Sequence, residues 1–310
     1  MIVTPRTGRQ HALGVLQALL VTFLWSTSWI LVKVGLDDLD LKPISFAGLR
    51  YALAALILLP FGVRAMRAAH AAVPLRGRLL ARVAIYGLLF IAVAQGAQFA
   101  ALAVLPATAV SLILSSIPMW VALIALAGGN ERASLGQAAG IGLLTVGALL
   151  YFGPFELTTD AGIGFVAAGV CVAAAAISSH LGRGLARDVI GALGGPIGLT
   201  AASMAVGSVA LLAAGVALEG WPAPDLAGWL IIGWLAVVNT AFAFTLWNHT
   251  LRTLTAVESS VVNNTMTVQI AVLAIVFLGE RLGPLQLVGL LLAAAGAAVV
   301  QLAPVLRRMR

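Results

Sequence analysis

The chain has 310 residues, of which 61% are hydrophobic and 9% are charged, and its mean hydropathy is +1.06. A soluble domain carries about 25% charged residues, so this chain has too little polar surface to fold in water. A single cysteine, Cys171, excludes an internal disulfide and any multi-cysteine metal site. We therefore expect a membrane protein, and we assign it no metal and no cofactor.

Ten apolar segments follow one another along the chain, and each is about as long as a membrane span. A helix needs about 20 apolar residues to cross a hydrocarbon core of roughly 30 Å. The segments are 12–34, 43–62, 80–101, 106–128, 134–152, 162–182, 195–218, 226–248, 256–278 and 283–302. Breakers such as Pro43, Pro106 and Pro304 stand at their boundaries. The pattern predicts an all-α polytopic membrane protein with ten transmembrane helices.

The charged residues in the loops predict how these helices are oriented. With the N-terminus in the cytoplasm, one set of alternate loops and tails holds fourteen arginines and two acids, whereas the other holds two basic residues and eight acids. Cytoplasmic loops are the ones enriched in arginine and lysine. We therefore expect a multi-pass protein of the bacterial inner membrane with both termini in the cytoplasm. The same bias explains the net charge of +7 without a nucleic-acid partner.

Two stretches of the chain share one pattern of polar residues and glycines. In each stretch a Glu-Arg pair precedes a glutamine and two glycines with the same spacing. The pairs, 149 positions apart, are Glu131/Glu280, Arg132/Arg281, Gln137/Gln286, Gly140/Gly289 and Gly147/Gly296. Each half contains five spans, an odd number, so the second half must cross the membrane in the opposite sense. This predicts two inverted five-helix repeats, a transporter architecture with a solute site near the midplane.

The repeat also predicts how the chain is divided. We expect a cytoplasmic tail at 1–11, a first repeat at 12–152, an outer linker at 153–161, a second repeat at 162–302 and a basic tail at 303–310. Glycines on the fifth and tenth spans, including Gly136, favour close helix approach or a contact between copies. We expect a monomer or a weak homodimer.

Polar residues at mid-depth gather on a few of the spans. They are Gln95 and Gln98 on the third span, Ser115 and Ser116 on the fourth, Asn239 on the eighth, and Asn263, Asn264 and Thr267 on the ninth. A single serine or threonine is better explained by a hydrogen bond between helices. The amides together favour a wet cavity, because unpaired amides are costly in hydrocarbon. We therefore predict that these residues bind a small-molecule substrate.

Aromatic and charged residues inside the spans extend the set of candidates. Tyr86, Trp25 and Trp120 could stack on a flat or apolar solute, although core or lipid packing explains each equally well. Arg50 lies about two turns from the outer edge of its span, where it could pair with an acid or attract a substrate carboxylate.

Two further charges lie near the ends of their spans. Lys33 could extend its amine to the interface, and Glu258 could pair with Arg252 at the cytoplasmic edge. A role in ion coupling is possible for Lys33 and for Glu258.

The ten spans, the two Glu-Arg motifs and the segment Trp25-Ser-Thr-Ser-Trp with Lys33 resemble the EamA family of the drug/metabolite transporter superfamily. The resemblance covers essentially the whole chain and is most specific from Gly279 to Gly296. The chain looks most like the YddG-type amino-acid exporters, whose substrates include aromatic amino acids. The resemblance implies a central cavity lined by the third, fourth, eighth and ninth helices, beside the first and sixth. The chain departs from the family's pattern at Gly128-Gly129-Asn130 and at Pro118.

Together these patterns predict an inner-membrane exporter of small metabolites, most readily apolar and aromatic amino acids, working by alternating access. Nucleosides and cationic drugs are the alternative substrates. A channel is a more distant alternative. An intramembrane enzyme is another, but the four histidines are scattered and no metal-ligand spacing such as H-E-x-x-H occurs, so we do not expect an enzyme.

Overall fold

A computed structural model describes residues 8–70, 77–127, 135–153, 159–189, 193–251 and 253–308. This part of the chain contains helices and no strands, and ten of its helical stretches are long and apolar enough to cross a membrane. The helices of the first half are α1 (Gly8–Asp37), α2 (Pro43–His70), α3 (Gly77–Gly87), η1 (Leu88–Gln95), α4 (Gly96–Val104), α5 (Ala107–Leu114), α6 (Ile117–Ala127) and α7 (Leu135–Phe152). Those of the second half are α8 (Thr159–Val189), α9 (Pro196–Glu219), α10 (Leu226–Ala236), η2 (Val237–Phe242), α11 (Ala243–Thr250), α12 (Ala256–Phe277) and α13 (Pro284–Arg308).

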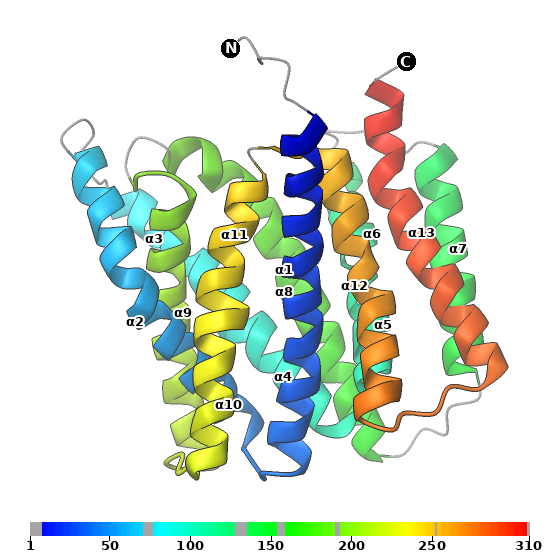
Figure 1. Ribbon diagram of the computed structural model, residues 1–310, viewed down its shortest axis with the longest axis horizontal. Helices are drawn as coiled ribbons and strands as arrows, with labels where there is room; N and C mark the ends of the chain where they lie inside the picture. Colours follow the sequence, from blue (N-terminus) through cyan, green and yellow to red (C-terminus); the bar gives the residue numbers. More distant parts are fainter. Residues whose placement is uncertain are drawn as a thin grey trace.

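The two halves cross the bundle in opposite senses, as the repeat predicts. The start of α1 and the end of α13 lie at the same end of the molecule, which we call the terminal end (Figure 1). The first helix of the second half, α8, begins at the opposite end, which we call the distal end (Figure 1). The first helix of each half therefore enters from a different side, and the prediction of ten helices in two inverted repeats is confirmed.

Three of the ten spans are interrupted in their middle. The third and eighth spans change from α-helix to π-helix at η1 and η2, and the fourth breaks between α5 and α6. The break in the fourth span follows from Pro118, which has no N–H for the carbonyl of Leu114, the last residue of α5. These interruptions place irregular backbone at mid-depth in the bundle.

The glycines of the fifth and tenth spans pack the two halves against each other through α7 and α13. A Cβ on Gly140 would lie 2.7 Å from the backbone nitrogen of Val300, and one on Gly289 would lie 2.6 Å from the carbonyl oxygen of Gly147. Only glycine allows the two backbones to approach so closely. The predicted close approach is confirmed, and it occurs within one chain.

The α2–α9 pair is the second close contact between halves. A Cβ on Gly48 would meet the Cα of Leu212 at 2.7 Å, and one on Gly215 would meet the nitrogen of Ser45 at 2.7 Å. At the distal end of this pair, Glu219 accepts hydrogen bonds from the backbone N–H groups of Ile44 and Ser45 at 2.9 and 2.7 Å. Its carboxylate therefore caps the N-terminus of α2.

Candidate functional site

The π-helical segments η1 and η2 occupy equivalent positions in the two repeats. Val237, the first residue of η2, follows Leu88, the first residue of η1, by 149 positions. π-Helical turns are rare and occur frequently at functional sites, because the wider turn changes which carbonyls and side chains face the neighbouring helices. A functional site is therefore expected near the centres of the third and eighth spans.

The η2 segment is joined to α1 by an amide. Asn239 is fully buried, and its Nδ2 donates to the carbonyl oxygen of Leu24 and, at 3.2 Å, to Oγ1 of Thr27. Its Oδ1 is buried and accepts no hydrogen bond from the described residues. One half of this amide holds two helices together, while the other half is a buried acceptor open to a further donor.

The η2 segment also contacts Arg50 of α2, a buried cation. Arg50 is 5% exposed, and its Nε donates to Oγ1 of Thr240 at 3.3 Å. Its guanidinium carbon lies 5.1 Å from the ring centre of Tyr51 and 5.9 Å from that of Phe99, so two aromatic rings contribute cation–π attraction. No carboxylate in the described part of the chain forms an ion pair with it. Sequence reasoning singled out Arg50 but missed Thr240, which is its partner.

The η1 segment is surrounded by aromatic side chains. Gln95, at its end, accepts a hydrogen bond from the hydroxyl of Tyr51 at 2.7 Å. Tyr86 stacks on Phe90, with the ring centres 5.6 Å apart and the planes at 15°. Gln98 follows one turn later on α4 and is half-buried. Tyr51 therefore connects the predicted glutamine of the third span with the predicted arginine of the second.

The polar residues of the fourth and ninth spans have different partners. The hydroxyls of Ser115 and Ser116 donate to carbonyls of their own helix, at Leu112 and Ile113. These bonds satisfy the serines locally, so they do not join helices. Pro118, three residues after Ser115, is what leaves this part of the span without regular helical bonds.

Asn264 of the ninth span is bonded to the tenth span. Its Oδ1 accepts from Nε2 of Gln301 at 3.0 Å, and its Nδ2 is buried without a partner among the described residues. Thr267 is half-buried and Asn263 is exposed on the same helix. Asn264 and Asn239 therefore each keep one unsatisfied amide atom.

The candidate aromatics lie in separate places. Trp25 packs against Phe244 and Trp247 of α11, with ring centres 5.3 Å apart in each pair. Trp120 is 47% exposed and lines an apolar groove of about 400 Å³ between α5–α6 and α8. This groove contains Ser116 but none of the predicted amides. Trp120 is therefore displaced from the polar residues with which the sequence grouped it.

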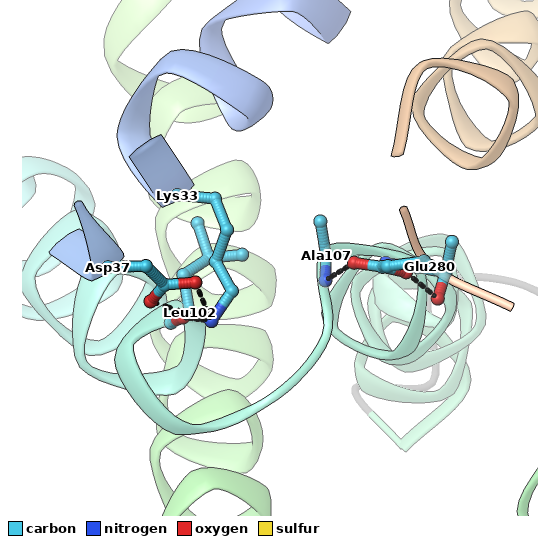
Figure 2. A network of polar contacts seen from close by, with 6 residues as sticks. Lys33, Asp37, Leu102, Ala107 and Glu280 are labelled. Carbon is cyan, nitrogen blue, oxygen red and sulfur yellow. Dashed lines mark hydrogen bonds and ion pairs between the residues drawn. The ribbon is translucent and has the colours of Figure 1, made fainter. Parts of the chain in front are cut away.

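The two charged residues considered for ion coupling, Glu258 and Lys33, both bind groups at the ends of helices. Glu258 forms a capping box with Thr255 at the start of α12, and its Oε1 lies 3.1 Å from Nε2 of His11. Arg252, its expected partner, lies outside the described residues. Lys33 donates to Asp37 at 3.1 Å and to the carbonyl oxygen of Leu102 at 2.9 Å (Figure 2).

A further carboxylate near Lys33 was assigned no role from the sequence. Glu280, in the turn between α12 and α13, accepts a hydrogen bond from the backbone N–H of Ala107 at the start of α5 (Figure 2). Its motif partner in the first half, Glu131-Arg132, lies outside the described residues. The signal that could have found this contact is Pro106, the residue before α5, which has no side chain able to cap that helix.

Comparison with known proteins identifies the family. The model of the EamA-like transporter family matches residues 12–153 and again residues 161–302. The chain belongs to the EamA-like transporter family. The second match begins and ends 149 residues after the first, which is the separation that the sequence repeat predicts.

As an EamA-like transporter, the chain is a membrane transporter of small molecules, since the family lies within the drug/metabolite transporter superfamily. A solved structure titled "Crystal structure of protein" has the same fold, with a TM-score of 0.65 and 19% identity over 94% of this chain and 98% of that one. No curated protein matches the chain.

Proposed function

We propose that this EamA-like transporter exports small metabolites that carry a carboxylate, most readily apolar and aromatic amino acids. The observation that carries the proposal is Arg50, a cation that is 5% exposed and has no acid among its described contacts. An arginine stays charged, and a charge within a membrane helix is costly, at roughly 2.5–3.5 kcal/mol for an arginine at the helix centre. A substrate carboxylate is the partner that would offset this cost during transport.

The surroundings of Arg50 favour a carboxylate joined to an apolar or aromatic group. The rings of Tyr51 and Phe99 lie beside the guanidinium group. The hydroxyl of Tyr51 donates a hydrogen bond to Gln95 of the third span. Asn239 lies next to Thr240 on η2 and has a free buried acceptor that suits an ammonium or amide donor. An amino acid carries both groups, one for Arg50 and one for an acceptor of this kind.

The inverted repeat supports transport by alternating access. Two halves of similar structure and opposite direction produce two conformations of nearly equal energy, each open to one side. The excess of arginine in alternate loops supports placing both termini in the cytoplasm of a bacterial cell. Export is then movement from the terminal end to the distal end. We propose that the protein works as a monomer or a weak homodimer.

Counterflow in proteoliposomes tests the substrate class. Labelled phenylalanine is expected to exchange, whereas phenylalaninamide, which lacks the carboxylate, is expected to exchange poorly. Arg50→Gln should reduce phenylalanine counterflow by about tenfold or more, because a hydrogen bond to a charged group contributes about 1.5–3 kcal/mol. Arg50→Lys should retain part of the activity. Lys42→Gln, which removes an exposed cation paired with Asp40, is the matched control.

Two results would overturn this proposal. One is equal exchange of phenylalanine and its amide, and the other is undiminished counterflow in a folded Arg50→Gln protein. A nucleoside and a lipophilic cation in the same assay test the alternative substrates. Exchange of either one without exchange of phenylalanine would replace the amino acid by that class.

Asn264→Leu tests whether the amides of the ninth span belong to the same site. The substitution removes a buried Nδ2 that has no described partner, and it breaks one bond to Gln301. We expect impaired counterflow in a protein that still inserts and remains monodisperse. Unchanged flux would remove Asn264 from the site.

A further inference from the structure

Pro106 leaves two kinds of backbone group without a partner where the third and fourth spans meet. The carbonyl of Leu102 would normally accept the N–H of the residue four positions later, but that residue is Pro106, which has none. Pro106 is also the N-cap residue of α5 and offers no side-chain acceptor to the first N–H groups of that helix. One proline therefore creates an unpaired carbonyl at the end of α4 and unpaired N–H groups at the start of α5.

Charges from elsewhere in the chain satisfy both kinds of group. Lys33 of α1 donates to the carbonyl of Leu102 at 2.9 Å, and Glu280 accepts from the N–H groups of Ala107 and Thr108 at 2.6 and 3.3 Å (Figure 2). Glu280 also accepts from the hydroxyl of Thr108 at 2.6 Å. A cation at a helix C-terminus and an anion at a helix N-terminus both suit the helix dipoles.

These contacts hold the turn at residues 102–108, which we call the α4–α5 corner, between the two halves. Lys33 belongs to the first half, whereas Glu280 belongs to the second. The corner also packs on α8 of the second half, since a Cβ on Gly164 would lie 2.5 Å from Cγ of Leu105. Leu102, Leu105 and Ala107 are at most 1% exposed, although they lie at the distal end of the bundle. The second half of the chain therefore helps to bury the α4–α5 corner.

The equivalent helix start in the second half is satisfied differently. Ala256, the first residue of α12, corresponds to Ala107 in the repeat, and α12 begins at the terminal end (Figure 1). Its helix is capped by its own Thr255 and Glu258 in a reciprocal box, and Glu258 also contacts His11. The box satisfies the backbone N–H groups of Thr255 and Glu258 with side chains of the same half. The start of α5, by contrast, is capped by a carboxylate of the other half, and the turn equivalent to that of Glu280 lies outside the described residues.

We propose that Glu280 is a gate residue whose bonds to the α4–α5 corner close the distal end of the transport pathway, with Lys33 holding the other side of the corner. Opening to the distal side requires the corner to leave Glu280. A cavity of about 420 Å³ lies between the two charges, lined by the end of α1, the corner and the end of α12, and provides space for this movement. The inference rests on the proposed alternating access but not on the identity of the substrate.

Glu219 provides a matched control for Glu280. It caps the N-terminus of α2 with the same geometry, accepting from two backbone N–H groups and from the hydroxyl of Ser45 at 2.7 Å. It joins α9 to α2, which are already in backbone contact at Gly48 and Gly215. Loss of Glu219 should therefore weaken the fold without opening a pathway.

Side-specific cysteine labelling tests the gate without any substrate. Cys171→Ala removes the one native thiol, and Ser111→Cys places a reporter one turn inside the corner, where Ser111 is 4% exposed. The full-length protein is reconstituted in sealed proteoliposomes of known orientation and treated with a membrane-impermeant maleimide from either side. Glu280→Gln should raise the distal-side labelling rate by about tenfold, the effect of one charged hydrogen bond, and leave terminal-side labelling unchanged.

The controls separate gating from general destabilisation. Glu219→Gln should lower the melting temperature and leave distal labelling unchanged. Lys33→Gln, which frees the carbonyl of Leu102, should raise distal labelling less than Glu280→Gln does, and it serves as the second variant if Glu280→Gln fails to fold. Unchanged distal labelling in folded variants, an equal rise from both sides, or an equal effect of Glu219→Gln would overturn the gate. Failure of phenylalanine counterflow leaves this result untouched.

Discussion

The π-helical segments η1 and η2 occupy the same position in the two repeats but are held by different forces. η1 is positioned by backbone contact, because a Cβ on Gly207 of α9 would meet the carbonyl oxygen of Gly87 and would lie 2.6 Å from Cβ of Ile91. η2 is positioned by side-chain hydrogen bonds, from Asn239 to α1 and from Arg50 to Thr240. The residues of η1 that correspond to Asn239 and Thr240 are the apolar Phe90 and Ile91.

This difference shows that the repeat conserves the path of the backbone without conserving its chemistry. Backbone geometry must be similar in both halves if the two conformations of a transporter are to be of similar energy. A solute has no such symmetry, so the polar groups that recognise it need not be duplicated. The π segment of the first repeat is held by close packing against α9, and that of the second repeat is held by hydrogen bonds to α1 and α2.

Breaking the packing of η1 should have the largest effect. Gly207→Val places methyl groups where the backbone of Gly87 and the side chain of Ile91 already lie. Overpacking of this kind costs about 1–3 kcal/mol, so we expect a clear fall in the melting temperature in detergent. Gly233→Ala, next to η2, is the control, because a Cβ there meets nothing within 4 Å. An unchanged melting temperature for Gly207→Val would refute backbone contact as the basis of η1.

Breaking the polar attachment of η2 should have an intermediate effect on stability and a large one on transport. Asn239→Leu removes the bonds to Leu24 and Thr27, each worth roughly 0.6 kcal/mol between membrane helices. We expect a modest loss of thermal stability together with reduced phenylalanine counterflow. Phe90→Leu, at the equivalent position of η1, should alter counterflow less. Equal losses in the two variants would mean that η2 has no special role in transport.

The smallest effect is expected from Thr240→Val, which keeps the shape of the side chain. It removes the hydroxyl that accepts from Arg50 and donates to the carbonyl of Leu235 at 2.8 Å. We expect a loss below about 1 kcal/mol. Amide hydrogen exchange should become faster in residues 237–242 and remain unchanged in 88–95. Faster exchange in both segments would show that they are not stabilised independently.

Much of the architecture could be predicted because its causes are local or repeated. The ten spans follow from runs of apolar residues that must match the thickness of a bilayer, and the two halves follow from glutamine and glycine spacings at a separation of 149. Arg50 could be selected because a cation within a span is costly wherever its partners lie. The sequence could not predict which groups Ser115, Ser116 and Trp120 contact, because helical spacing shows which residues share a face but not which helix packs against that face.

The sequence by itself therefore determined the number of spans, their division into repeats and the residues whose burial demands an explanation. Only the tertiary structure decided how those demands are met: that Thr240 contacts Arg50, that Lys33 satisfies the carbonyl of Leu102, and that Glu280 caps a helix beginning at Ala107. The physical reason is that the amino-acid sequence alone shows where a backbone group or a charge will lack a local partner. Its partner, in contrast, can come from any segment that packing brings within hydrogen-bonding distance.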